Sequence, residues 1–374
     1  MKKTYIDTAM ERIAPDLILK GGNVVDVFSG RVIKADVIIK DGIICGVGSY
    51  SGENEQDVSG IYVMPGFIDS HVHIESSMTQ PSEYAKAVMP HGITTVIADP
   101  HEITNVCGED GLEFMLKSAK NIPLDVNLML PSCVPATPFE HTGANLDAKT
   151  TQKLAPKFFG IGEMMNYPGI VSGDDETLGK LCLDIIDGHA PLLSGHELDA
   201  YASAGIKTDH ECSVVEEMTE KISKGMYILL REGTLSLDVA KLIKGVTPYT
   251  LRRCAFCTDD RFVGEIIRDG SIDHCIRKAV SLGLNNIDAI IMATLNACEM
   301  YGMKNKGAIA PSYVADIVVA DDLNLSSISQ VYKNGKLVCE NGKALFECET
   351  VDNSKVTNTV HLPKISADFF KTDV

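Results

Sequence analysis

Eight short apolar runs alternate with stretches of helical length through the middle of this 374-residue chain, and this alternation limits the folds open to it more than any other feature. The stretches of helical length include residues 81–89, 111–118, 176–181 and 214–223. The strand-like runs cover residues 63–68, 94–98, 124–130, 158–162, 183–187, 206–208, 226–230 and 253–257. Eight strands alternating with helices favour an α/β fold, a (β/α)8 barrel of the TIM type.

A doubly wound open sheet is the alternative arrangement for such a series. Polar side chains of metal-binding type stand at the carboxyl ends of the runs all round the series, at His71, Glu163 and His189 among others. In a barrel these ends converge on one face, whereas in an open sheet they would be spread along an edge. We therefore expect the barrel.

The two ends of the chain have a different pattern. Residues from about 16 to 63 read as short strands separated by turns, with a hairpin signal at Asp41-Gly42. A similar pattern of strand, Asn-Gly turn and strand returns between residues 315 and 338. We interpret residues 1–62 and 305–350 as one small β-sandwich domain built from both chain ends, with the barrel, residues 63–304, between them.

Two histidines, His71 and His73, end the first strand-like run. Alternate residues of a strand point to the same face, so the two imidazoles project together and could bind one metal ion. Four further residues of ligand type follow later runs, namely Glu163, His189, His210 and Asp259. Four imidazoles and two carboxylates suit two adjacent divalent ions that share a carboxylate, and N/O ligation fits Zn, Mn or Fe(II). Paired metals hold a hydroxide and aim it at an electrophilic carbon.

Each of these residues also has a structural interpretation. Glu163 could cap a helix, His189 could be a buried structural histidine, and Asp259 could be an N-cap. Six such residues at successive strand ends are hard to explain by chance placement, so the joint pattern favours a metal site.

Residues 65–73 read Pro-Gly-Phe-Ile-Asp-Ser-His-Val-His. This motif resembles the amidohydrolase superfamily. A narrower resemblance, to bacterial and archaeal adenine deaminases, rests on Ile-Glu-Ser-Ser at 74–77 and Ala-Asp-Pro-His-Glu-Ile-Thr-Asn-Val at 98–106. It is supported by the motifs at 131–136, 162–166, 187–191, 209–211, 231–233 and 258–261.

The resemblance implies hydrolytic deamination of adenine to hypoxanthine and ammonia by a metal-bound hydroxide. It implies two divalent metal ions, Mn or Fe(II), held by His71, His73, Glu163, His189, His210 and Asp259. Glu163 stands where many superfamily members carry a carboxylated lysine, as it does in adenine deaminases. This position speaks against dihydroorotase-like or urease-like activities.

The resemblance also assigns roles beyond the ligands. Asp259 would accept a proton from the attacking hydroxide and help to deliver it to the leaving amine. A ring nitrogen must gain a proton as well, and either Glu211 or the pair His101 and Glu102 could supply it. Contacts to the purine are expected from Arg231, Ser132, Asn166 and Glu75.

Two alternatives to adenine deamination stay open. The chain could be another amidohydrolase that acts on a different aminopurine or a cyclic amide. It could also be a truncated, non-catalytic remnant that acts as a partner. Residues 351–374 resemble the start of a further C-terminal domain of this family, so we expect a homo-oligomer or a separate polypeptide that supplies that domain.

Bulk properties exclude several other classes of function. The formal net charge of -17 argues against nucleic acids and anionic membranes as partners. The N-terminus lacks the apolar core of a signal peptide, and no apolar run approaches the ~20 residues that span a bilayer. The eleven cysteines are scattered, and Cys254 and Cys257 lie in a strand-like run. We expect reduced, mostly buried cysteines and a cytoplasmic location.

Overall fold

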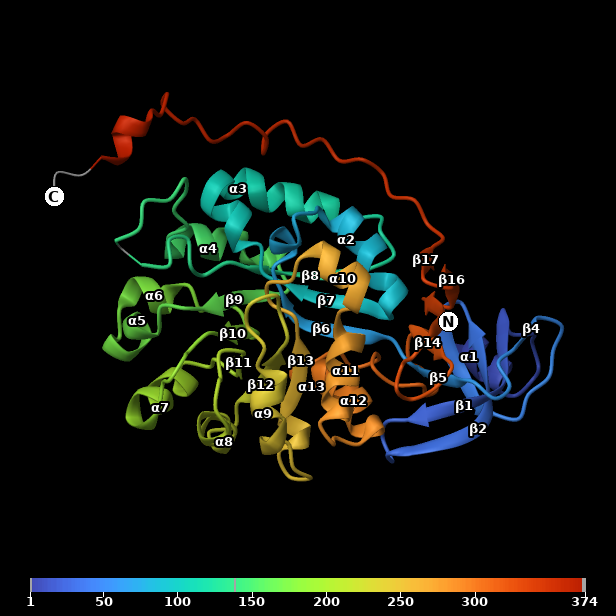
Figure 1. The fold of residues 1–374 in the computed structure, drawn as a ribbon. Coiled ribbons are helices and arrows are strands. Elements are labelled where there is room, and N and C mark those ends of the chain that lie inside the picture. The colour runs from blue at the N-terminus through green and yellow to red at the C-terminus, as the bar shows by residue number, and fades with distance from the viewer. Residues whose placement is uncertain (1, 138, 372–374) are drawn as a thin grey trace.

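The computed structural model describes residues 2–137 and 139–371, and its centre is a parallel β-barrel (Figure 1). The eight barrel strands are β6 (Phe67–Val72), β7 (Ile93–Ala98), β8 (Asp125–Leu130), β9 (Gly160–Met164), β10 (Ile186–Gly188), β11 (Thr208–Asp209), β12 (Tyr227–Arg231) and β13 (Cys254–Cys257).

The barrel strands follow chain order around a closed ring. They pair in parallel in two runs, β6 to β10 and β11 to β13. A parallel bridge between Val72 and Asp259 joins β13 back to β6. The remaining gap lies between β10 and β11. A hydrogen bond from the Gly188 N–H to the Thr208 hydroxyl, at 2.9 Å, connects these two strands. This ring confirms the predicted (β/α)8 barrel and excludes the doubly wound sheet.

The sequence of the strands explains their place inside the molecule. Every residue of β6, β7, β9 and β13 is buried. Parallel strands covered on both faces favour continuous apolar, β-branched sequences, and Ile-Thr-Thr-Val-Ile-Ala in β7 is of this kind. The helices that cover the outer face bury their apolar sides against these strands.

The covering helices mostly follow the barrel strands along the chain. They are α2 (Pro81–Val88), α3 (His101–Ser118), α4 (Ala148–Leu154), α5 (Tyr167–Ser172), α6 (Asp175–Gly179), α7 (Gly195–Ser203), α8 (Val215–Ser223), α9 (Val239–Leu242), α10 (Val263–Asp269), α11 (Ile272–Ser281), α12 (Asn286–Met292) and α13 (Leu295–Met300). Short 3-10 turns are η1 (Ile74–Ser77), η2 (Met89–His91), η3 (Ala155–Lys157), η4 (Ile243–Gly245), η5 (Leu251–Arg253) and η6 (Ala367–Phe370). Helix α3 is longer than the predicted 111–118 because it continues N-terminally past a kink at Gly108.

The prediction of a single strand at 63–68 is wrong, because the chain changes sheet at Gly66. Strand β5 (Tyr62–Pro65) belongs to the small sheet, and the barrel begins with β6. A side chain at Gly66 would meet Thr94, whose hydroxyl oxygen would lie 2.3 Å from the added Cβ. The close approach of β7 at this point therefore requires glycine.

Both ends of the chain contribute to one small sheet. Its strands are β1 (Leu17–Asp26), β2 (Arg31–Lys40), β3 (Ile43–Gly48), β4 (Glu55–Asp57), β5, β14 (Ile317–Ala320), β15 (Ile328–Lys333), β16 (Lys336–Glu340) and β17 (Lys343–Ala344). The antiparallel pairing of β5 with β14 joins the two halves. The sheet curls until Ile43 bridges Val314, so its hydrogen bonds are continuous around a shared apolar core.

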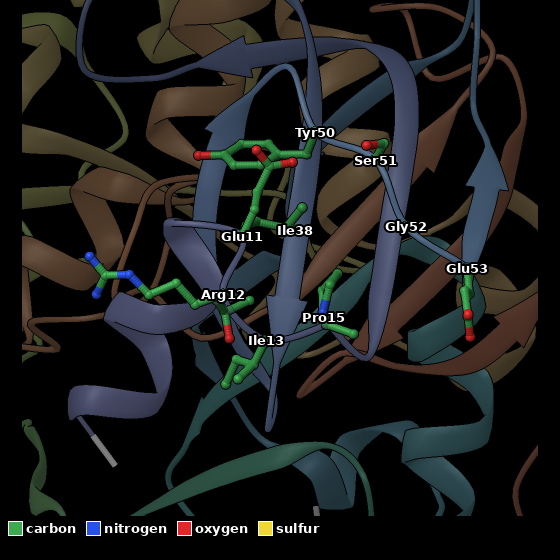
Figure 2. A pocket seen from close by; sticks show the side chains of 11 residues that line it. Glu11, Arg12, Ile13, Pro15, Ile38, Tyr50, Ser51, Gly52 and Glu53 are labelled. Atoms are coloured by element: carbon green, nitrogen blue, oxygen red, sulfur yellow. The ribbon is translucent and has the colours of Figure 1, made fainter.

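The structure shows two features at the chain ends that the sequence did not predict: an N-terminal helix beside a cavity, and an extended C-terminal segment. Helix α1 (Lys2–Ala9) packs beside β3, and a cavity of about 320 Å³ lies between its end and the loop after β3. Glu11, Arg12, Tyr50 and Glu53 line this cavity (Figure 2), which is on the small sheet and away from the ends of the barrel strands. The segment 351–371 contains no strand in the described structure and runs past α3 (Figure 1), where Lys355 pairs with Asp110 at 2.8 Å.

Two further sequence-based expectations can be compared with the described residues. No helix in residues 2–137 and 139–371 is both long and apolar enough to cross a membrane. All eleven cysteines are free thiols, and Cys254 and Cys257 are buried in β13 as expected.

A buried lysine connects the loop after β10 to the end of β11. The Lys221 ammonium donates to the Ala190 carbonyl at 2.6 Å, to Asp209 at 2.9 Å and to Glu217 at 2.7 Å. Asp209 also accepts from the Ala190 N–H at 2.8 Å. Ala190 follows His189 and Asp209 precedes His210, so this ion cluster sets the positions of two histidines.

We predict that Lys221→Met lowers the free energy of unfolding by about 3–5 kcal/mol, because it leaves the buried Asp209 carboxylate without its cation. Lys224→Met is the matched control. Lys224 lies at the end of the same helix and pairs with Asp199 on the surface, so its loss should leave the free energy of unfolding close to that of the parent chain. Urea unfolding of the two variants measures both values, and equal stabilities would contradict the structural role of Lys221.

Candidate metal centre

Six residues of ligand type meet at the carboxyl end of the barrel. His71 lies in β6 and His73 directly after it, and Glu163 lies in β9. His189, His210 and Asp259 follow β10, β11 and β13. The structure brings all six predicted ligands together, and every one of them except His189 is at least nine-tenths buried.

Glu163 lies between two sets of imidazoles. Its Oε1 atom is 3.5 Å from His73 Nε2. Its Oε2 atom is 2.7 Å from His189 Nδ1 and 3.1 Å from His210 Nε2. Each oxygen of the carboxylate therefore faces a different histidine set, which is the arrangement that a carboxylate shared by two cations requires.

Asp259 completes the cluster from the opposite side. Its Oδ1 atom lies 3.2 Å from His73 Nε2 and 3.8 Å from His71 Nε2. Its backbone φ is 56°, a left-handed conformation that is uncommon for residues other than glycine. Two hydrogen bonds hold the backbone there, from the Asp259 N–H to the His71 carbonyl at 3.0 Å and from the His73 N–H to the Asp259 carbonyl at 3.2 Å. Backbone strain of this kind is commonly found at functional sites.

The donor set fits divalent metal ions. His71 Nε2 and His73 Nε2 are only 3.1 Å apart, and several sets of three ligand atoms lie within 4.8 Å of one another. Such sets include His71, His73 and Glu163 on one side and Glu163, His189 and His210 on the other. Imidazole nitrogens that converge beside buried carboxylates form the kind of N/O donor set that binds divalent cations.

Residues around the ligands orient them. Asp187 Oδ2 lies 3.5 Å from His71 Nδ1, and the Tyr301 hydroxyl donates to Asp187 Oδ1 at 2.9 Å. The Asp99 carbonyl is 2.8 Å from His73 Nδ1, while the Asp99 carboxylate accepts from the Glu163 N–H at 2.8 Å. Outer partners of this kind fix the orientation of metal-binding imidazoles. Sequence analysis did not predict Asp99 or Asp187, although each stands two residues before a histidine at a strand end.

Comparison with known proteins agrees with this geometry. Residues 62–338 match the model of the amidohydrolase family. The chain belongs to the amidohydrolase family. The predicted superfamily membership is thereby confirmed.

The sequence of this amidohydrolase is similar to those of two curated relatives. Adenine deaminase 2 of Desulfotalea psychrophila is 48% identical over 376 residues, covering 99% of this chain and 65% of the relative. Adenine deaminase of Clostridium acetobutylicum is 49% identical over 371 residues, covering 97% of this chain and 65% of the relative. The chain thus spans just under two thirds of the length of these relatives.

Solved structures share the fold of this amidohydrolase. Beta-aspartyl dipeptidase from Fervidobacterium islandicum superposes with a TM-score of 0.63 at 20% identity, covering 90% of this chain and 99% of that chain. An enamidase gives a TM-score of 0.63 at 18% identity, covering 88% of this chain and 97% of that chain. At these identities the likeness concerns the fold alone.

The predicted proton donors lie at the rim of the amidohydrolase site. Glu211 Oε1 is 3.6 Å from His210 Nε2. His101 Nδ1 is 3.2 Å from Glu163 Oε1, and Glu102 Oε2 is 3.5 Å from His73 Nδ1. Glu75 accepts from the Ile103 N–H at 3.3 Å, and its other oxygen is buried without a hydrogen-bond partner among the described residues.

Several carboxyl and imidazole groups at the site have shifted pKa values. Burial opposes the ionisation of Asp259, but a hydrogen bond from His73 and the neighbouring imidazoles hold the pKa of this carboxyl below its usual range. Burial and the nearby Glu102 raise the pKa of Glu75 to about 7. Burial lowers the pKa of His101, but the neighbouring carboxylates of Asp99 and Glu163 outweigh it and raise the pKa to about 11.

Three residues expected to contact a purine are engaged in other interactions. Ser132 donates its hydroxyl hydrogen to the Glu163 carbonyl at 2.6 Å. Asn166 caps α5 by accepting from the Gly169 N–H at 3.1 Å, and its amide donates to Thr177 at 2.9 Å. Arg231 bonds to carboxylates, among them Asp259 at 2.7 Å. Short sequence motifs identify such residues without showing which neighbours they meet.

We predict that Glu163→Gln binds less metal than the parent chain. The amide keeps the shape of the side chain but loses the charge that two cations would share. Metal analysis of the purified proteins measures the change, with Glu113→Gln as the control because Glu113 is a surface partner of Lys117. Retention of two metal ions per chain in Glu163→Gln would rule out the bridging role.

Proposed function

We propose that this amidohydrolase converts adenine and water to hypoxanthine and ammonia at a pair of divalent metal ions, Mn or Fe(II). The observation that carries the proposal is the six-residue cluster in which each oxygen of Glu163 faces a different histidine set. The high identity to proteins named adenine deaminase over nearly the whole chain supports the choice of substrate.

His71, His73, Glu163, His189, His210 and Asp259 would hold the metal ions. Bound divalent ions would supply an activated water, because coordination lowers the pKa of water towards neutrality.

Asp259 is the residue best placed to move the proton of the attacking water. Its Oδ1 atom faces His71 and His73, and its pKa stays low. It accepts one proton as the water oxygen bonds to C6 of adenine. It then gives that proton to the amino nitrogen as the bond from C6 to nitrogen breaks, so ammonia leaves and hypoxanthine remains.

The ring nitrogen next to C6 must carry a proton while C6 is tetrahedral. Glu211 reaches the cluster from the β11 side, 3.6 Å from His210 Nε2. His101 and Glu102 reach it from the start of α3, where His101 Nε2 lies 3.7 Å from Glu102 Oε1. Either Glu211 or the pair His101 and Glu102 can donate this proton to a ring held between them. The second proton of the attacking water leaves the oxygen on C6 as hypoxanthine forms and restores the donor. Glu75 lies next to the His101 and Glu102 pair, where it accepts from the Ile103 N–H.

A pocket of about 330 Å³ next to Asp259 suits a planar ring. The turn after η1, the loop after β12 and the loop after β13 form its walls. Met78, Leu235 and Phe262 line it and are exposed, Leu235 to 92%. Exposed large apolar side chains around a polar centre favour binding of an aromatic ligand.

We expect Phe262→Ala to raise the KM for adenine roughly two- to tenfold with little change in kcat, because an aromatic contact contributes about 0.5–1.5 kcal/mol. Tyr249→Ala is the matched control. Tyr249 is 87% exposed but precedes β13, at the opposite end of the barrel. Steady-state kinetics measures both, and an unchanged KM in Phe262→Ala would remove this pocket from the substrate site.

Ammonia release from adenine tests the proposed function directly. The purified chain, supplied with Mn or Fe(II) and analysed for metal on the same sample, should turn adenine over with about two metal ions bound. Asp259→Asn should lose turnover by at least about 100-fold while keeping its fold, since the amide cannot accept the proton.

Other outcomes of the ammonia assay separate the alternatives. Metal binding without ammonia release would contradict adenine turnover by this chain alone and favour another aminopurine, a cyclic amide or a requirement for a separate partner polypeptide. Neither metal nor turnover would favour the non-catalytic remnant. A cytoplasmic location, self-association and a separate partner polypeptide stay predictions.

A further inference from the structure

A buried arginine lies between two of the carboxylates assigned to the reaction. The Arg231 Nη1 group donates to Asp259 Oδ2 at 2.7 Å and also to Glu211 Oε1. Arg231 is the last residue of β12, and its side chain is only 10% exposed. One guanidinium nitrogen thus connects Asp259, which follows β13, to Glu211, which lies in the loop after β11.

A third carboxylate holds the other edge of the guanidinium. Arg231 Nε donates to Asp238 Oδ2 at 3.2 Å. Asp238 is itself fixed, because its N–H donates to the Arg231 carbonyl at 2.8 Å and its Oδ1 accepts from Lys241 at 2.7 Å. Asp238 therefore fixes the plane of the guanidinium at Nε, and this orientation directs Nη1 at Asp259 and Glu211.

The two carboxylates in front of Arg231 face different halves of the metal centre. Asp259 uses Oδ2 for Arg231, which leaves Oδ1 directed at His71 and His73. Glu211 lies 3.6 Å from His210 and 3.9 Å from His189, the imidazoles that contact Glu163 Oε2. A rotation of either carboxylate away from the site would break its bond to the guanidinium.

We propose that Arg231 is a positioning residue, which locks Asp259 and Glu211 in the orientation that the reaction requires and does not bind the substrate. The inference rests on the proposed function for its kinetic consequence, but the geometry itself concerns only this chain's residues. A lysine could replace the charge but not the arrangement, because its single ammonium lacks the planar fork that reaches Asp238 and both front carboxylates.

Three explanations of Arg231 predict different results. A positioning residue affects kcat more than KM, a substrate-binding residue affects KM, and a residue needed only for folding affects stability and metal content alike. The charge pattern agrees with the first explanation, since all three partners of the guanidinium are carboxylates of the protein.

The experiment compares Arg231→Ala and Arg231→Lys with the parent chain loaded with Mn. We expect about two Mn per chain in each protein, a fall in kcat of about 100-fold or more, and a KM within about threefold, because small misplacements of catalytic groups cost this much. Millimolar guanidinium should partly restore turnover in Arg231→Ala, while urea at the same concentration should not. Arg268→Met, which removes an exposed arginine paired with Asp269, is the control and should behave like the parent.

The electron paramagnetic resonance spectrum of the bound Mn gives a readout that does not depend on the substrate. If Asp259 is released, the spectrum of Arg231→Ala should differ from the parent spectrum and return towards it with guanidinium. A raised KM with unchanged kcat, or a spectrum identical to that of the parent, would overturn the proposal. Absence of adenine turnover in the parent chain would contradict the proposed function instead, and the spectra would still decide the role of Arg231.

Discussion

The backbone pairing between the end of β6 and Asp259, two residues after β13, is the constraint on which the site depends. Two hydrogen bonds, from Asp259 to the His71 carbonyl and from His73 to the Asp259 carbonyl, close the barrel ring. The same bonds bring His71, His73 and Asp259 together from opposite ends of the barrel sequence. They also hold Asp259 in a left-handed conformation that it would rarely adopt alone. The same two hydrogen bonds therefore close the barrel and set the relative positions of His71, His73 and Asp259.

Charged side chains that surround the six residues of ligand type hold those residues in place. The buried carboxylates of Asp187 and Asp99 face the imidazoles from behind, and Arg231 and Lys221 hold other carboxylates in place. Lys221 has two carboxylate partners and Arg231 has three, so these clusters keep an excess of negative charge that bound metal ions would balance. The site thus combines rigid anchoring with an electrostatic preference for cations.

The sequence alone predicted the barrel and the clustering of six residues of ligand type because both depend on local patterns. Apolar runs of strand length and polar residues at their ends are visible without knowledge of tertiary contacts. The change of sheet at Gly66 was missed because β5 and β6 form one continuous apolar run, and only the close approach of Thr94 separates them. Asn166, Ser132 and Arg231 could be named as functional residues, but their partners come from distant parts of the chain. Hydrogen bonds such as that from Arg231 to Asp259 are set by the packing of neighbouring loops, which residue spacing does not reveal.

The pairing of β5 with β14 has a consequence for synthesis of the chain. Strands from residues 17–65 cannot complete their sheet until residues 317–320 have left the ribosome. At about 5–20 residues per second, roughly 13–50 s pass between the appearance of the two partners. During that interval the edge of β5 is unpaired, and all the barrel strands leave the ribosome before β14 does. Pairing of β14 with β5 then completes the small sheet and joins the N-terminal and C-terminal segments of the chain.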